Sequence, residues 1–163
     1  MNVIIIEDEE LLQQRLTRIL KNINAQANII KILSTVKESI HFFENNKIPI
    51  DLILSDIQLG DGTSFKIFEK IKIIYPIIFI TSHEKYLLKA FEVNTIDYLL
   101  KPVKQEELEK SINKMTALKD FNNAKVDQFI QTILSAYPEA ERNKDNRNGF
   151  LVKLKKIFAI KRN

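Results

Sequence analysis

The chain contains no cysteine among its 163 residues and only two histidines, His41 and His83. The lack of thiols excludes disulfide frameworks, thiolate zinc sites, iron–sulfur clusters and cysteine nucleophiles. Two histidines also disfavour an all-histidine metal centre. No apolar run approaches the roughly 18 residues that a membrane span needs, and residues 1–7 carry no basic signal-peptide head. We therefore expect a soluble, cytoplasmic protein without a membrane partner.

The composition is close to the globular average, with 45% hydrophobic and 28% charged residues, which excludes wholesale disorder. The net charge of +4 is unevenly spread. Residues 1–119 hold 16 basic and 16 acidic residues, whereas residues 120–163 hold 9 and 5. This asymmetry points to an anionic partner such as nucleic acid, although a solvated basic end explains the charge equally well.

Short apolar runs rich in isoleucine alternate with segments of helical periodicity over residues 1–119. The runs lie at residues 2–7, 28–33, 51–56, 76–81 and 96–100. The first helical segment places five apolar residues on one face: Leu12, Leu16, Ile19, Leu20 and Ile23. Runs that are apolar on both faces are typical of parallel strands with helices on both sides. The alternation predicts a doubly wound α/β domain with a five-stranded parallel sheet.

The pattern changes after residue 120. Apolar residues at helical spacing predict an amphipathic helix over 121–137, which Pro138 ends. Residues 138–149 are polar and predict a linker. Residues 150–163 alternate between apolar and basic and are too few to bury a core of their own. We expect one complete domain, 1–120, followed by a helix, a linker and the incomplete start of a second domain.

Polar residues end or directly follow four of the predicted strands: Glu7, Asp8, Asp56, Thr81, Lys101 and Pro102. Ligands of open parallel sheets bind beyond the carboxyl ends of the strands, so these positions converge where a ligand would lie. Three carboxylates in one place repel each other and raise each other's pKa, and a hard cation such as Mg²⁺ relieves this repulsion. No glycine-rich phosphate loop follows the first strand, which argues against a nucleotide cradle. A carboxylate nucleophile, a metal, a hydroxyl and a lysine together suit the binding of one phosphoryl group.

Each of these residues also has a plainer interpretation. Acids and lysines at strand ends are often solvated loop residues. Thr81 could be a helix N-cap, and Lys101–Pro102 could mark a helix start. The coincidence at four strand ends is what favours a functional site.

Four segments carry a resemblance to a known family: "IIIEDE", "LILSDIQLGDG", "FITS" and "IDYLLKP". In order and spacing they resemble the receiver domain of two-component response regulators. The resemblance implies a flavodoxin-like fold with strand order 2-1-3-4-5. The segments "DIQLGDGTSF" and "LKAFEVNTIDYLLKP" are similar to receivers that precede a LytTR-type DNA-binding domain, and residues 150–163 resemble the first strands of that output domain.

The resemblance also implies a phosphoacceptor and a metal site. Asp56 would accept a phosphoryl group from a sensor histidine kinase. Asp8 and Asp56 would bind Mg²⁺ directly, Glu7 would bind it through water, and Gln58 would offer its backbone carbonyl. Many receivers carry Asp at the position of Glu7, but the longer glutamate arm still reaches through water.

The remaining implied roles concern the phosphoryl group and the switch. Lys101 would pair with phosphoryl oxygens, and Pro102 would follow a cis peptide bond. Thr81 would hydrogen-bond the phosphoryl group, coupled to rotation of Tyr98. Phosphorylation would then favour a homodimer through residues 84–119, where lysines are interspersed with acids that include Asp97, so that opposite charges pair.

The expected function is therefore a phosphoacceptor switch, with self-catalysed phosphoryl transfer and autodephosphorylation, that regulates transcription through DNA binding by the full-length protein. One alternative is a Mg²⁺-dependent phosphatase or phosphotransferase with an aspartate nucleophile. Such enzymes usually need a second acid two residues beyond the nucleophile, where this chain has Gln58, and a cap insertion. The other alternative is a pseudo-receiver scaffold that is never phosphorylated, against which the intact Asp56, Asp8, Thr81 and Lys101 argue.

Overall fold

The computed structural model describes residues 1–119, of which Met1–Ile112 form one compact unit. The helix predicted at 121–137, the linker at 138–149 and the domain start at 150–163 lie outside the described residues. The boundary of the first domain at residue 120 therefore stays a prediction.

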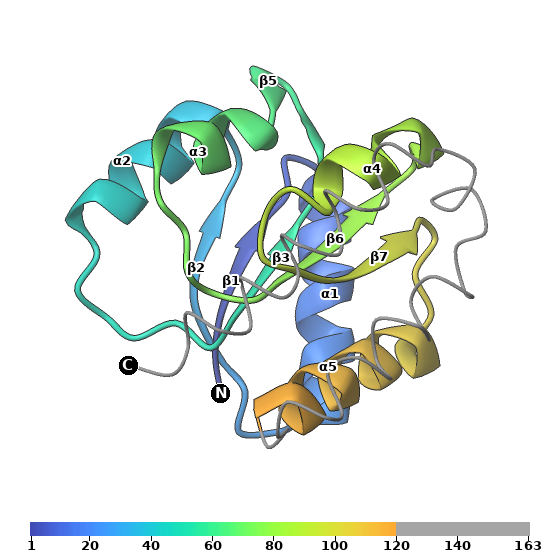
Figure 1. Ribbon diagram of the computed structural model, residues 1–163. Helices are drawn as coiled ribbons and strands as arrows, with labels where there is room; N and C mark the ends of the chain where they lie inside the picture. Colours follow the sequence, from blue (N-terminus) through green and yellow to red (C-terminus); the bar gives the residue numbers. More distant parts are fainter. Residues whose placement is uncertain (120–163) are drawn as a thin grey trace. The chain divides into compact units, whose positions relative to one another are not determined.

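Five strands form a single parallel sheet (Figure 1). They are β1 (Asn2–Ile6), β2 (Asn28–Leu33), β3 (Leu52–Ser55), β6 (Ile77–Thr81) and β7 (Thr95–Leu100). Their order is β2-β1-β3-β6-β7, with every neighbouring pair parallel. This is the order 2-1-3-4-5 once the strands of the main sheet are counted by themselves. The predicted doubly wound, flavodoxin-like fold is confirmed.

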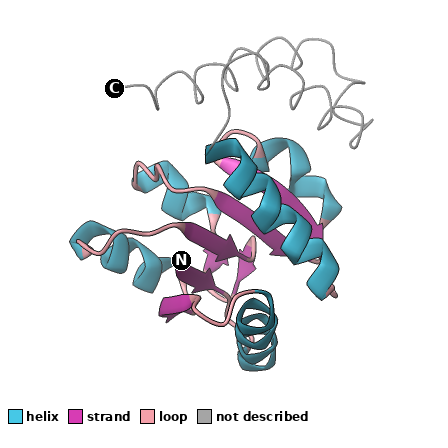
Figure 2. Cartoon of the chain, turned by 90° about the horizontal axis from the view of Figure 1, so that it is seen from below, coloured by secondary structure: helices cyan, strands magenta, loops and turns pink. Residues whose placement is uncertain are grey.

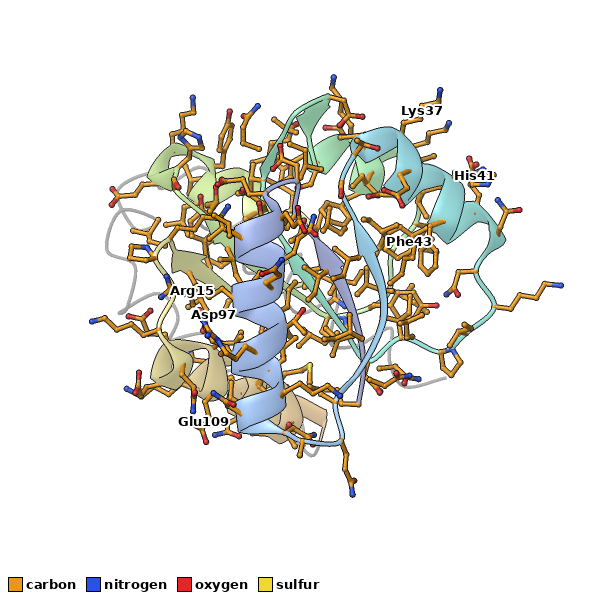
Figure 3. The ribbon with its side chains drawn as sticks, turned by 180° about the vertical axis from the view of Figure 1, so that it is seen from behind. Arg15, Lys37, His41, Phe43, Asp97 and Glu109 are labelled. Atoms are coloured by element: carbon orange, nitrogen blue, oxygen red, sulfur yellow. The ribbon has the colours of Figure 1, made fainter. Side chains whose placement is uncertain are left out.

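Helices cover both faces of this sheet (Figure 2). They are α1 (Glu10–Ile23), α2 (Val36–Asn45), α3 (Phe65–Lys70), α4 (Leu87–Ala90) and α5 (Gln105–Lys119), with a short 3₁₀ helix, η1 (Glu84–Tyr86), before α4. Each long helix turns an apolar side toward the sheet: in α2, Phe43 lies on the inner side, while Lys37 and His41 point outward (Figure 3). None of the described helices is long and apolar enough to cross a membrane.

The core lies on the central strands. Every residue of β3 and β6 is buried, as are Val3–Ile6 of β1. The sheet edge differs, because β2 is buried only at Leu33 although its sequence is nearly as apolar. An edge strand has a neighbour on one side only, so an apolar run does not by itself imply complete burial.

Three local features differ from the sequence predictions or were not foreseen. A small hairpin of β4 (Gln58–Leu59) and β5 (Gly62–Thr63) follows the third strand of the sheet. The helical periodicity that Leu87 and Phe91 share in the sequence corresponds to a helix, α4, of only four residues. Asp97 is buried and accepts a hydrogen bond from the Ser111 hydroxyl at 2.7 Å, so its place among the exposed charges of residues 84–119 was wrong.

The burial pattern predicts where truncation is costly. Leu54, in the middle of β3, is fully buried, so Leu54→Ala should lower the free energy of unfolding by about 2–5 kcal/mol through lost apolar burial and the cavity that remains. Leu11 is 79% exposed, and Leu11→Ala should change the free energy of unfolding by less than about 0.5 kcal/mol. Urea denaturation followed by circular dichroism measures both, and equal losses would contradict the assignment of the core.

Candidate functional site

The carboxyl ends of two neighbouring strands, β1 and β3, bring an acidic cluster together. Glu7 and Asp8 directly follow β1, and Asp56 directly follows β3. One carboxylate oxygen from each of the three residues lies within 4.8 Å of the other two. Glu7 is fully buried, Asp56 is 7% exposed and Asp8 is exposed, so the cluster has a closed inner side and an open outer side. The convergence expected at this edge of the sheet is present.

The carboxylate of Asp56 is held from both sides. Its Oδ1 accepts hydrogen bonds from the backbone N–H groups of Ile57 at 2.5 Å and Gln58 at 3.2 Å. Its Oδ2 accepts a hydrogen bond from Lys101 Nζ at 2.6 Å. The backbone N–H of Asp56 in turn donates to the carbonyl of Ile6 at 2.8 Å, which ties the end of β3 to β1. These bonds fix the orientation of the Asp56 carboxylate.

Lys101 joins two of the acids, because its Nζ lies 2.6 Å from Asp56 Oδ2 and 2.8 Å from Glu7 Oε2. Burial by itself would lower the pKa of Lys101, but the hydrogen bonds to Asp56 and Glu7 outweigh it and raise the pKa. The peptide bond between Lys101 and Pro102 is cis. The backbone N–H of Lys101 donates to the carbonyl of Thr81 at 2.9 Å, so the lysine is anchored to the end of β6.

One ammonium does not fully compensate the buried charge. Burial raises the pKa of Glu7, although the ion pair with Lys101 and a 3.2 Å hydrogen bond from the Glu9 N–H act in the opposite direction. The donors in the cluster are all carboxylate oxygens, the ligands that Mg²⁺ prefers. The residues therefore fit a hard divalent cation. Gln58, whose carbonyl was expected to contribute, lies two residues past Asp56 at the start of β4.

Thr81 and Tyr98 lie on neighbouring strands beside the cluster. Thr81 is fully buried, and its Oγ1 has no hydrogen-bond partner among the described residues. Tyr98 is 6% exposed and its hydroxyl donates to the carbonyl of His83. Burial, and then the negative charge of Asp56, raise the pKa of Tyr98 to about 12. Tyr98 is therefore neutral and inward-facing in this state.

Two plainer interpretations do not hold: Thr81 as a helix N-cap, and Lys101–Pro102 as a helix start. η1 begins at Glu84 with His83 as its N-cap residue, so Thr81 caps no helix. α5 begins at Gln105, three residues beyond Pro102, so Lys101–Pro102 is not the helix start.

Sequence reasoning missed Arg15 of α1, which Figure 3 labels. Its Nη2 donates to the carbonyl of Val103 at 3.0 Å, so α1 holds the segment that follows Lys101 and Pro102. The two partners are 88 positions apart, and one is a backbone carbonyl. No sequence pattern marks such a contact.

The comparisons with known proteins agree with this fold and site. Residues 3–113 match the family described as the response regulator receiver domain. The chain belongs to this family and is the receiver domain of a two-component response regulator.

Curated relatives of the chain include regulators named LytR, in accordance with the resemblance to LytTR-type regulators. The chain is 34% identical over 145 residues to the sensory transduction protein LytR of Staphylococcus epidermidis, a match that covers 87% of this chain and 56% of that protein. It is 36% identical over 129 residues to the transcriptional regulatory protein LytR of Staphylococcus aureus, covering 76% and 51%. The chain thus spans about half the length of the curated relatives it matches.

Solved structures show the same fold. The response regulatory domain of the protein mrkE from Klebsiella pneumoniae superposes with a TM-score of 0.63 and 29% sequence identity, covering 72% of this chain and 96% of that one. The receiver domain of PhyR from Erythrobacter litoralis gives a TM-score of 0.60 at 26% identity, covering 75% and 92%.

The raised pKa of Glu7 yields a prediction for the metal-free protein. An acid with a raised pKa in the folded state binds more protons folded than unfolded, so its contribution to stability falls as the pH rises through that range. Glu7→Gln removes the buried charge and should raise the free energy of unfolding at pH 7 in EDTA, with a smaller gain below pH 4. Urea denaturation at both pH values measures this.

Glu109→Gln, an exposed residue of α5, is the matched control and should change the free energy of unfolding by less than about 0.5 kcal/mol. A loss of stability in Glu7→Gln at pH 7 would show that the ion pair with Lys101 outweighs the cost of burial.

Proposed function

We propose that Asp56 accepts a phosphoryl group from the phosphohistidine of a sensor histidine kinase, the class of protein with which response regulator receivers partner. A carboxylate oxygen of Asp56 attacks the phosphorus, the P–N bond breaks, and the imidazole keeps the electron pair. The observation that carries this proposal is the fixed carboxylate of Asp56, held by two backbone N–H groups and Lys101 in an acidic cluster that is open on the side of Asp8.

The surrounding residues are suited to the charge of the acceptor and its product. Asp8 and Asp56 would hold Mg²⁺ directly, Glu7 through water, and Gln58 through its carbonyl; the metal would neutralise phosphoryl oxygens. Lys101, already 2.6 Å from Asp56 Oδ2, would pair with the phosphoryl group from the other side.

A conformational response would begin at Thr81. Its buried hydroxyl lacks a hydrogen-bond partner, so a phosphoryl oxygen on Asp56 would supply the missing acceptor. Thr81 lies two residues after Phe79 in β6, so both side chains are on the same face of the strand. The Phe79 ring packs against Tyr98 with ring centroids 6.4 Å apart. A shift of Thr81 would therefore change the packing around Tyr98 and the nearby surface of η1, α4 and β7.

We propose that this surface, within residues 84–119, forms a homodimer in the phosphorylated protein. Leu88 of α4 and Leu100 of β7 are 44% and 42% exposed, which offers apolar area beside the charged residues. Lys89 already pairs with Glu69 of α3 at 3.0 Å, so not every charge is available to a partner subunit.

Transcription is the proposed output. One relative is named a transcriptional regulatory protein, and it is about twice as long as the matched region. The excess of basic residues after position 120 accords with contacts to an anionic partner in the full-length protein. The phosphatase alternative is disfavoured, because Gln58 cannot act as the second acid and the relatives are named as regulators.

Phosphorylation at Asp56 can be tested by intact-mass analysis with acetyl phosphate and Mg²⁺. The wild-type chain should gain one phosphoryl group, and Asp56→Asn should gain none. EDTA should also prevent the gain, because the acids and the dianionic phosphoryl group repel each other without a cation. Asp51→Asn, on an acid at the opposite end of β3, is the control and should be phosphorylated normally. An adduct on Asp56→Asn, or an undiminished adduct in EDTA, would refute the proposal.

Dimerisation can be tested by sedimentation velocity with beryllofluoride as a phosphoryl mimic. Beryllofluoride should shift the wild-type chain toward a dimer, and high salt should weaken that dimer, because each exposed ion pair contributes only about 0–1 kcal/mol. Leu88→Asp should prevent the shift without preventing phosphorylation. A monomer at every accessible concentration would contradict this part of the proposal.

A further inference from the structure

The hairpin of β4 and β5 is anchored to a helix on another part of the chain. Asp61 lies in the turn of the hairpin, and its Oδ1 accepts a hydrogen bond from the Val36 N–H at 2.7 Å. Its Oδ2 accepts a second bond from the Lys37 N–H at 3.1 Å. Burial opposes ionisation of Asp61, but these backbone hydrogen bonds outweigh it and lower the pKa. Asp61 is therefore a charged clamp on the first turn of α2.

The hairpin is too small to define its own position. Its strands have two residues each, with Gln58 opposite Thr63 and Leu59 opposite Gly62. The Ser64 N–H donates to the Ile57 carbonyl at 2.8 Å and closes the base of the hairpin. Isolated two-stranded hairpins are marginally stable, so an anchor at the turn is needed to hold this one in place.

This hairpin also contacts the acidic cluster. The N–H of Gln58 donates to Asp56 Oδ1, and the carbonyl of the same residue is the proposed metal ligand. A Cβ atom placed on Gly60 would lie 3.5 Å from Asp8 Oδ2, so the turn passes directly beside the exposed acid. A displacement of the hairpin would therefore move groups next to two of the three acids.

We infer that Asp61 is a positioning residue for the metal site, acting by clamping the β4–β5 hairpin to the N-terminus of α2. This inference rests on the proposed function, because it assigns to Asp61 the task of holding Gln58 and the turn beside Asp8 where the cation binds. Asp61 lies outside the acidic cluster, and α2 contributes none of the proposed ligands. The affinity of the site for Mg²⁺ would nevertheless depend on the contact between them.

The chain offers a matched control, because α2 has a second cap whose hydrogen bond lies within the helix end itself and does not involve the hairpin. Thr35 Oγ1 accepts a hydrogen bond from the Glu38 N–H at 3.0 Å. Thr35→Ala therefore weakens the same helix end as Asp61→Ala but leaves the hairpin clamp in place. A role of Asp61 confined to helix capping predicts equal effects of the two substitutions on metal binding.

The experiment is calorimetric titration of Mg²⁺ into the full 163-residue chain, without phosphoryl donor, for wild type, Asp61→Ala, Asp61→Asn and Thr35→Ala. Asp61→Ala should weaken Mg²⁺ binding roughly tenfold, because substitution of a residue that supports the metal ligands typically lowers metal affinity by about that factor. Asp61→Asn retains one acceptor oxygen for the Val36 N–H and should give a smaller loss. Thr35→Ala should bind Mg²⁺ like wild type, although urea denaturation should show that both alanine variants are destabilised.

The outcomes separate this inference from the proposed function. No Mg²⁺ uptake by the wild-type chain would contradict the proposed metal site itself. Normal uptake by wild type together with equal uptake by Asp61→Ala and Asp61→Asn would overturn the positioning role alone. A loss in Thr35→Ala as large as that in Asp61→Ala would also overturn it, because helix capping would then suffice. If Asp61→Ala does not fold, wild-type affinity in a folded Asp61→Asn overturns the inference and an intermediate loss supports it.

Discussion

The ion pairs of the Lys101 ammonium are the interaction on which this end of the sheet depends. Lys101 lies 2.8 Å from a carboxylate oxygen of Glu7 and 2.6 Å from one of Asp56, and all three side chains are largely buried. Without the ammonium, two carboxylates at the ends of β1 and β3 would face each other uncompensated, at a cost of several kcal/mol. With it, the ends of β1, β3 and β7 meet around one fixed carboxylate. The remaining excess of negative charge is what would attract a divalent cation to the site.

A continuous set of aromatic rings extends from this site toward the surface proposed to change. The ring of Phe79 packs against Phe65 at 5.5 Å and against Tyr98 at 6.4 Å, and Phe65 packs against Tyr86 of η1 at 5.9 Å. Close-packed rings shift together rather than individually, because the interior has few voids to absorb a movement. Packing of this kind provides a physical route from Thr81 to η1 and α4 without any charged relay.

The five strands and the residues that converge at their ends could be predicted from the sequence, whereas the side-chain contacts to main chain around them could not. Isoleucine-rich runs and helical spacing reflect burial, and the parallel fold brings Glu7, Asp8, Asp56 and Lys101 to one edge of the sheet. The contacts from Arg15 to the Val103 carbonyl and from Asp61 to backbone N–H groups of α2 leave no trace in periodicity, because one partner is always main chain. The burial of Asp97 was missed because an acid in a strand is usually expected to be exposed. In the structure its carboxylate accepts hydrogen bonds from the Ser111 hydroxyl of α5 and from the Tyr98 N–H.

The central claim is that one carboxylate, Asp56, carries the phosphoryl group. Borohydride reduction of the protein after treatment with acetyl phosphate and Mg²⁺ tests it most directly, because reduction converts an aspartyl phosphate into homoserine, which peptide mass mapping locates. Homoserine is expected at position 56 and at no other aspartate of the chain. Homoserine at Asp8 or Asp61, or a phosphorylated protein that yields no homoserine at position 56, would contradict it.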